Sequence, residues 1–247
     1  MPTAFGRLVT RTLDAHADPA VKAGAERYFR GALAFRGVGG PTVQRVFRDT
    51  RHALRDAAPD QVLDEALALL RSPYGEDRQV AVLLLHQARR RLPPDTIRRL
   101  EPVVDAASRD WATIDGIAGR VLRYLIPRSD AERRRVVAWS RSRNPWRQRA
   151  SAVAFLAHAR AGHHADDILA IGARIVRTPF RFTQLGLGWV LRELWLAHPA
   201  RMEAFLADHL GEMSAEGLRY AIEKMPAARR ARWMARRRAL ARTERNA

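Results

Sequence analysis

The feature of this sequence that most constrains its fold is the helical spacing of apolar residues along almost the whole chain. Apolar side chains recur at intervals of three and four residues, as at Val62, Leu63, Ala66, Leu67 and Leu70. No segment alternates convincingly between apolar and polar residues, as a half-buried strand would. Helix starts are also marked, because a capping side chain precedes a proline at Asp18, Asn144 and Thr178. The sequence predicts an all-α protein.

A second pattern repeats at nearly constant intervals. Four short segments stand in the same register, at separations of 34, 35 and 36 residues: Gln79–Ala81, Thr113–Asp115, Gln148–Ala150 and Gln184–Gly186. Two positions before them stand Asp77, Trp111, Trp146 and Phe182. A period of this size indicates one helical hairpin per repeat, stacked into a solenoid with a concave face. The tetratricopeptide consensus is not evident, so we favour HEAT-like units. Accidental periodicity in an ordinary helical bundle is the alternative.

The chain carries a formal net charge of +18, and nearly all of its positive residues are arginines, since only Lys22 and Lys224 are lysines. Guanidinium groups bind phosphates in bidentate fashion, although a GC-rich genome also enriches arginine. The charge favours a polyanionic partner, chiefly nucleic acid, held in a basic groove.

Several classes of protein are excluded or disfavoured. The chain has no cysteine, which excludes disulfides and a thiol nucleophile. It has no Walker loop, no dinucleotide-binding glycine pattern and no nucleophile elbow, so we expect no cofactor. His163 and His164 are better explained as solvated turn residues than as metal ligands. Without a signal sequence or an apolar span, we expect a soluble cytoplasmic protein, associated with the bacterial nucleoid and not with a membrane.

No linker-like composition divides the sequence, so we expect one domain over residues 1–247. Residues 226–247 form its basic end, where arginines surround Trp233. This segment is either a last helix or a frayed tail. Its charges serve either as a solvated surface or as non-specific phosphate contacts.

The residues most suggestive of chemistry are Trp111 and Asp115. They are four positions apart, so in a helix they project from the same side. In a strongly basic chain a carboxylate beside an indole suggests chemistry on a cation. A paired core carboxylate and a buried tryptophan are the structural alternatives. Trp189 and Arg192 also share a helix face, and Gly186 and Gly188 suggest close approach by a helix or by a DNA backbone.

These motifs resemble a known family. Arg109–Asp115 (RDWATID), Trp146–Ala150 (WRQRA) and Gly188–Glu193 (GWVLRE) are similar to segments of the DNA alkylation repair family, the AlkD-type HEAT-repeat DNA glycosylases. Two N-terminal segments, Ala25–Phe29 and Phe35–Pro41, also resemble it. The likeness extends from about residue 18 to about residue 225. Asp110 departs from the pattern, because some relatives carry a second aromatic residue there.

The resemblance implies a function and a set of site residues. It implies a monomeric enzyme that removes N3- or N7-alkylated purines, including bulky adducts, from double-stranded DNA without flipping the base. Trp111 and Asp115 would face the deoxyribose of the lesion, and Trp189 would complete the aromatic cradle. The residues expected to contact DNA are Arg149, Arg147, Arg192 and Tyr28. A noncatalytic DNA-structure binder and a protein-interaction scaffold are the alternatives.

Overall fold

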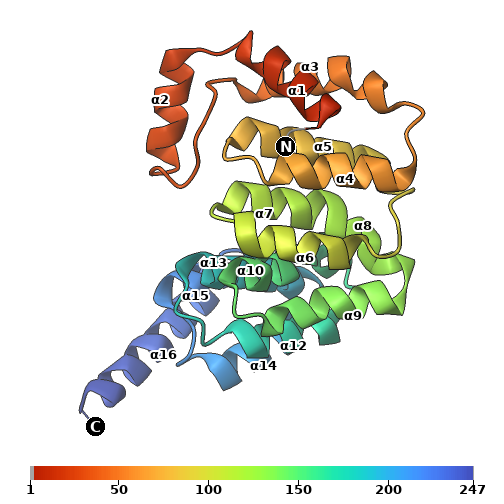
Figure 1. Cartoon of the computed structure of the whole chain (residues 1–247). Coiled ribbons are helices and arrows are strands. Elements are labelled where there is room, and N and C mark those ends of the chain that lie inside the picture. Colours follow the sequence, from red (N-terminus) through yellow and green to blue (C-terminus); the bar gives the residue numbers. More distant parts are fainter. Residues whose placement is uncertain (1–2, 247) are drawn as a thin grey trace. The chain divides into compact units, whose positions relative to one another are not determined.

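The computed structural model describes residues 3–246, with side chains described as far as residue 242. Within this range the ordered elements are helices, apart from one isolated β-bridge between Ala34 and Tyr74 (Figure 1). The predicted all-α class is therefore confirmed. None of the described helices combines the length and the apolar character that crossing a membrane requires. The chain separates into two compact units, with the division between Arg133 and Arg134.

The first unit is built from short helices around a continuous apolar core. Its α-helices are α1 (Ala4–Asp14), α2 (Pro19–Tyr28), α3 (Gly40–Thr50), α4 (Pro59–Leu70), α5 (Gly75–Ala88), α6 (Thr96–Ala107), α7 (Trp111–Ile117) and α8 (Arg123–Leu125). Shorter turns are η1 (Arg51–Leu54), η2 (Ala118–Leu122) and η3 (Ile126–Arg128). Helix α9 (Asp130–Ala138) spans the division between the units. Val9, Leu63, Leu85, Leu100 and Ile114 are completely buried in the core.

The second unit is organised around one long helix, α13 (Arg181–Ala197), which packs against α10 (Pro145–Val153), α11 (Leu156–Arg160) and α15 (Ala215–Ala221). The other elements are η4 (Trp139–Arg141), α12 (Ala165–Ile175), α14 (Pro199–His209) and α16 (Ala227–Asn246). The basic C-terminal segment is thus helical from Ala227, and residue 247 lies outside the described residues.

Hydrogen bonds and ion pairs repeatedly join residues that are about one repeat apart in the sequence. The ion pairs with a separation of 35 residues are Arg99–Asp64, Arg177–Glu212, Arg181–Glu216 and Arg201–Asp166. The bonds from His86 to the carbonyl of Arg120, from Arg128 to that of Leu92 and from His198 to that of Gly162 span 34, 36 and 36 residues. The period inferred from the sequence therefore recurs in the contacts within each unit.

The expected helix starts are mostly correct. Asp18 and Asn144 accept hydrogen bonds from the first turns of α2 and α10. Thr178 was expected to begin a helix at Pro179, but that prediction is wrong, because α13 begins only at Arg181. The hydroxyl of Thr178 instead accepts a bond from the backbone N–H of Phe180. The Thr178–Pro179 pair therefore marks the turn that precedes α13 and not the first residue of the helix.

The expected close approach at Gly188 is made by another helix. A Cβ atom added to Gly188 would lie 2.5 Å from the carbonyl oxygen of Gly217 in α15. We predict that Gly188→Ala lowers the free energy of unfolding by about 1–3 kcal/mol, because the backbones must separate. Gly24→Ala is the control, since a Cβ atom there meets nothing within 4 Å. It should raise stability by about 0.5–1 kcal/mol through helix propensity.

Urea unfolding followed by circular dichroism measures both changes. Equal midpoints for Gly188→Ala and the unmodified protein would show that the two helices are not held at this distance.

Candidate functional site

Helix α7 carries two of the predicted catalytic residues, and a buried carboxylate fixes where this helix begins. Asp110 is the N-cap, and its Oδ1 accepts a hydrogen bond of 2.6 Å from the backbone N–H of Thr113. Only 2% of Asp110 is exposed. Its Oδ2 lies 3.6 Å from the guanidinium of Arg78, which is itself buried. The family resemblance marked Asp110 only as a departure, whereas in the structure it caps α7.

Arg78 connects this cap to the loops on either side. Its Nε donates to the carbonyl of Ser72 and its Nη1 to the carbonyl of Ala107, at 2.7 and 2.8 Å. Burial lowers the pKa of Arg78 below its ordinary value, and the charge of Asp110 opposes this effect. Arg78 therefore holds the end of α6, the start of α5 and the cap of α7 together. The position of Trp111 follows from this fixed helix start.

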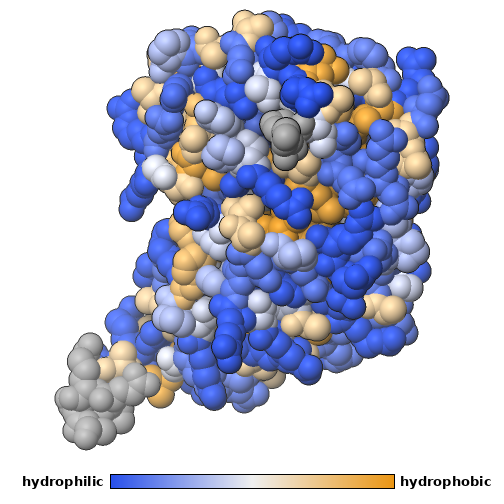
Figure 2. Space-filling model, in the orientation of Figure 1, coloured by the Kyte–Doolittle hydropathy of each residue, from blue (hydrophilic) through white to orange (hydrophobic). Residues whose placement is uncertain are grey.

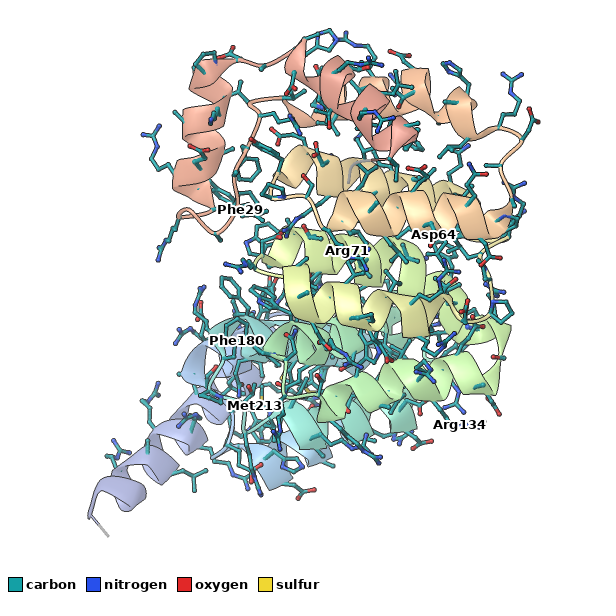
Figure 3. The ribbon with its side chains drawn as sticks, in the orientation of Figure 1. Phe29, Asp64, Arg71, Arg134, Phe180 and Met213 are labelled. Atoms are coloured by element: carbon teal, nitrogen blue, oxygen red, sulfur yellow. The ribbon has the colours of Figure 1, made fainter. Side chains whose placement is uncertain are left out.

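Trp111 is half-buried and packs against aromatic residues at the end of α2. Its ring stacks on Phe29 with a centroid distance of 5.8 Å and an interplanar angle of 23°. It meets Tyr28 edge-on at 6.2 Å, and Phe29 packs in turn against Phe35 at 5.1 Å. Tyr28 is 68% exposed. The structure thus brings the predicted Tyr28 and Trp111 together, and it adds Phe29 (Figure 3), which the sequence reasoning did not single out.

Asp115 lies one turn after Trp111 on the same helix and is partly exposed. Its carboxylate is therefore neither sealed in the core nor fully solvated. The neighbouring face of α7 is different, because Ala112 and Gly116, together with Arg120 in η2, line a mostly apolar cavity of about 610 Å³. That cavity is also walled by Phe29, which follows α2, and by residues of α2, α3 and α5. Asp115 and Trp111 thus belong to a surface beside the cavity and not to its lining.

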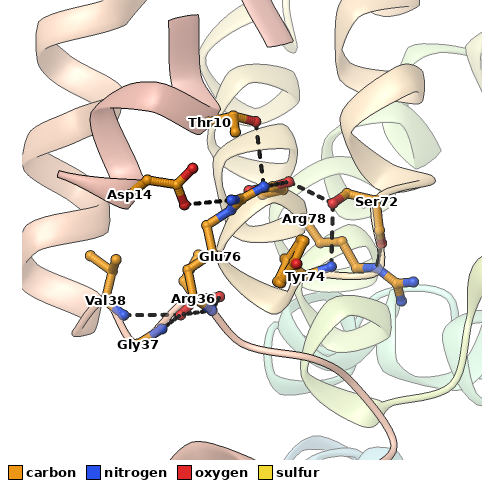
Figure 4. A network of polar contacts seen from close by, with 10 residues as sticks. Thr10, Asp14, Arg36, Gly37, Val38, Ser72, Tyr74, Glu76 and Arg78 are labelled. Atoms are coloured by element: carbon orange, nitrogen blue, oxygen red, sulfur yellow. Dashed lines mark hydrogen bonds and ion pairs between the residues drawn. The ribbon is translucent and has the colours of Figure 1, made fainter. Parts of the chain in front are cut away.

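The segment that carries Phe29 and Phe35 is held by a polar network on α5 (Figure 4). The carboxylate of Glu76 accepts hydrogen bonds from the backbone N–H groups of Arg36, Gly37 and Val38, at 2.9 to 3.1 Å. The guanidinium of Arg36 bonds to Asp77 at 2.8 and 3.0 Å, and to Asp14. Burial alone would lower the pKa of Arg36, but the bonds to both carboxylates raise it above its ordinary value. This network positions the aromatic partners of Trp111.

The second unit contains a similar aromatic cluster at the start of α10. Trp146 stacks on Phe182 at 5.5 Å and meets Phe180 edge-on at 5.0 Å. Phe180 is labelled in Figure 3. Trp146 is half-buried, and the guanidinium of Arg147 lies 5.1 Å from the ring centroid of Trp139. Three residues at equivalent positions of the sequence repeat each lie at the first or second residue of a helix, namely Trp111, Trp146 and Phe182.

The structure places two of the arginines expected to contact DNA in internal bonds. Arg149 is 6% exposed and donates a hydrogen bond to the carbonyl of Phe182. Arg192 pairs with Glu193 at 2.9 Å and with Glu223 at 2.5 Å. Burial alone would lower the pKa of Arg192, but its bonds to the two glutamates raise it above its ordinary value. Sequence spacing gave no sign of these internal partners of Arg149 and Arg192.

The other tryptophan of the predicted site, Trp189, lies three residues before Arg192 on α13 and is partly exposed.

Comparison with known proteins identifies the class to which these features belong. The family model for the DNA alkylation repair enzyme matches residues 9–225. Because this match covers most of the sequence, the chain belongs to the DNA alkylation repair enzyme family.

The fold agrees with that assignment. The structure is similar to a solved one described as a predicted DNA alkylation repair enzyme from Enterococcus faecalis, with a TM-score of 0.77 and 17% sequence identity. The similarity covers 86% of this chain and 98% of that chain. At this level of identity the likeness establishes the fold alone. Among proteins with curated functions, none matches this sequence.

The ion pairs of Glu193 predict a pH-dependent contribution to stability. Burial alone would raise the pKa of Glu193, but its bonds to Arg160 and Arg192 lower it below its ordinary value of 4.5. A lowered folded-state pKa stabilises the protein above the unfolded-state pKa, and this stabilisation is lost as the pH falls through the folded-state pKa. Glu193→Gln should therefore cost roughly 1–3 kcal/mol at pH 7.

Urea unfolding at several pH values tests this expectation. The difference between Glu193→Gln and the unmodified protein should be constant above about pH 5 and shrink below pH 4.5. A difference that stays constant down to about pH 3 would contradict the assignment.

Proposed function

We propose that this protein is a monofunctional DNA glycosylase that excises cationic N3- or N7-alkylated purines from duplex DNA, including bulky adducts, without flipping the base. The observation that carries the proposal is the partly exposed pair of Trp111 and Asp115, displayed from a helix whose start is fixed by a buried cap. Membership in the DNA alkylation repair enzyme family and the net charge of +18 support a DNA substrate.

The lesion explains why a carboxylate is the group required. Alkylation at N3 or N7 gives the purine a positive charge, so the base leaves without protonation by the enzyme. As the glycosidic bond breaks, positive charge develops on the deoxyribose in an oxocarbenium-like transition state. A fixed anion beside the sugar stabilises that state more than the ground state, which lowers the barrier. We assign this role to Asp115, which would also orient the attacking water.

The aromatic residues supply a second source of stabilisation. The indole face of Trp111 would interact with the cationic sugar, an interaction worth on the order of 0.5–2 kcal/mol. Phe29 stacks on this indole and Tyr28 packs against it edge-on. The same role for Trp189, in the second unit, is a prediction that rests on the family resemblance.

The location of Asp115 supports excision without base flipping. Enzymes that extrude a base bind it in a pocket that reads its edges. Asp115 and Trp111 lie outside the lining of the neighbouring cavity, and both are partly exposed. Such a pair can contact the sugar of a stacked nucleotide. Because no pocket has to enclose the base, adduct size is not restricted there.

DNA binding is proposed for Tyr28, Arg147, Arg149 and Arg192. Tyr28 is exposed and needs no rearrangement. Arg149 and Arg192 have internal partners, so phosphate contact by either one requires an exchange of bonds. The HEAT-like solenoid and its concave basic groove are likewise proposals, supported by contacts that span 34 to 36 residues within each unit.

The catalytic role of Asp115 predicts a specific loss of excision. With a duplex that contains one N7-methylguanine, Asp115→Asn should reduce the single-turnover rate by about 100-fold or more. Duplex affinity should hold or rise, because a negative charge near phosphate is removed. Strand cleavage by alkali at the abasic product measures the rate, and fluorescence anisotropy measures affinity.

Asp49→Asn is the matched control, because Asp49 is an exposed carboxylate on α3 of the same unit. It should leave the rate unchanged. Undiminished excision by Asp115→Asn would refute the role of this residue. Duplex binding with no excision, even by the unmodified protein, would favour the noncatalytic DNA-structure binder.

The aromatic contribution is tested separately at Trp111. Trp111→Ala should slow single-turnover excision roughly 3- to 30-fold, the kinetic equivalent of removing a cation-π interaction. Trp111→Phe should slow it less, because it keeps an aromatic face against Phe29. Saturating enzyme and a thermal melt of each variant separate the chemical step from binding and folding. Equal rates for all three proteins would contradict a contact between the indole and the sugar.

A further inference from the structure

Helix α16 (Ala227–Asn246) lies beyond the region that the family model matches, which ends at residue 225. Residues 227–242 contain seven arginines, and the first acidic residue of the helix is Glu244. A helix of this composition gains nothing from internal ion pairs, because opposite charges at a spacing of three or four are missing over this stretch. Neither the segment that the family model matches nor ion pairing within the helix therefore explains why α16 is rich in arginine.

One face of α16 is anchored to the second unit. Trp233 is 8% exposed, and the Nε of Arg237 donates a hydrogen bond of 3.0 Å to the carbonyl of Met213. Arg229 pairs with Glu203 at 2.7 Å, and Arg230 donates to the carbonyl of Met225 at 3.0 Å. Figure 1 shows the helix running outward beyond α15. These bonds fix which face of the helix is turned outward.

The outward face has a regular arrangement of small and basic residues. Ala231, Ala235 and Ala239 are exposed and recur every four positions, so they form one row along the helix. Helical geometry places Arg232 and Arg236 on one side of this row and places Arg238 and Arg242 on the other. All four arginines are exposed.

These four arginines differ from several other exposed arginines of the second unit. Among the described residues they form no ion pair, although Arg236 stacks on the ring of Trp233 at 5.5 Å. By contrast, the exposed Arg177, Arg181 and Arg201 each pair with a carboxylate about one repeat away. The outward face of α16 thus presents four exposed guanidinium groups that form no ion pair with the described residues.

This arrangement fits a duplex better than a lipid surface. A helix about 10–12 Å across matches the width of the major groove, about 12 Å, and a row of alanines permits close approach. Arginines on both sides can then reach the phosphates of both strands. A helix that binds membranes needs bulky apolar side chains on its exposed face. Here Trp233 is buried, and Leu240, which is 39% exposed, lies seven residues after it on the same side of the helix and outside the outward row of alanines. Most of the surface visible in Figure 2 is hydrophilic.

We propose that α16 is a sequence-independent DNA-binding helix, which contacts phosphates on both sides of a groove through Arg232, Arg236, Arg238 and Arg242. This inference rests on the proposed function for the presence of duplex DNA. It adds a binding element that is separate from the residues assigned to excision.

The test is the salt dependence of affinity for an undamaged duplex. Replacing all four arginines with glutamine (Arg232→Gln, Arg236→Gln, Arg238→Gln, Arg242→Gln) should reduce the slope of log affinity against log salt by about 3.6, at about 0.9 for each phosphate that is no longer neutralised. At about 0.1 M salt the affinity should fall at least about 30-fold. Single-turnover excision at saturating enzyme should change less than about twofold, because α7 is untouched.

Two further variants serve as controls. The matched quadruple lysine variant keeps the charges and should retain affinity to within about threefold. The pair Arg238→Gln and Arg242→Gln lies away from the anchoring bonds, so it tests the charges without disturbing them. It should produce about half of the change in slope. Circular dichroism melts establish that each variant is folded.

The possible failures are distinguishable. An unchanged slope in the quadruple glutamine variant, with a steep slope in the unmodified protein, would overturn the role of α16 and leave the proposed function intact. A flat slope in the unmodified protein would overturn both. An equal loss of affinity in the lysine and glutamine variants would contradict a phosphate contact made by charge. Loss of binding to phosphatidylserine vesicles, with duplex affinity unchanged, would assign the helix to a membrane surface instead.

Discussion

The packing of the helices in each unit depends on a buried apolar core, and ion pairs between residues about one sequence repeat apart are added at the surface. Ion pairs such as Arg99–Asp64 and Arg181–Glu216 connect residues 35 positions apart. Trp111 and Trp146 each lie at the start of a helix and stack on a phenylalanine, but their partners come from different places in the sequence. Phe29 lies 82 residues before Trp111, whereas Phe182 lies 36 residues after Trp146. Aromatic surfaces thus form at both helix starts through different tertiary contacts.

The start of α7, which carries the proposed catalytic pair, depends on a buried pair of opposite charges. Asp110 and Arg78 are almost completely excluded from solvent, so each needs the other to offset the cost of burial. Their pairing sets the first residue of α7 and hence the direction in which Trp111 and Asp115 project. A second buried carboxylate, Glu76, fixes the segment that supplies Phe29 and Phe35. The proposed catalytic pair is therefore positioned by groups that do not themselves need to touch DNA.

The sequence predicted the helical class, the repeat length and most helix starts, because these depend on local spacing and on capping residues. It also brought Trp111, Asp115 and Tyr28 into consideration. It did not single out Asp110 as the cap, although the bond to Thr113 is local and aspartate is a preferred capping residue. The buried pairing of Asp110 with Arg78 joins residues 32 positions apart, so local spacing could not predict it. Two internal partners of Arg149 and Arg192 also come from tertiary packing, since the carbonyl of Phe182 and the carboxylate of Glu223 lie 33 and 31 positions away. Spacing along one helix carries no information on such contacts.

The central claim is that the Asp115 carboxylate stabilises positive charge on the sugar. It is tested most directly by affinity for duplexes with a cationic pyrrolidine in place of the deoxyribose, compared with a neutral tetrahydrofuran at the same position. We expect the unmodified protein to prefer the cationic analogue by at least about tenfold and Asp115→Asn to abolish this preference. Equal affinity of the unmodified protein for the two duplexes would contradict the claim.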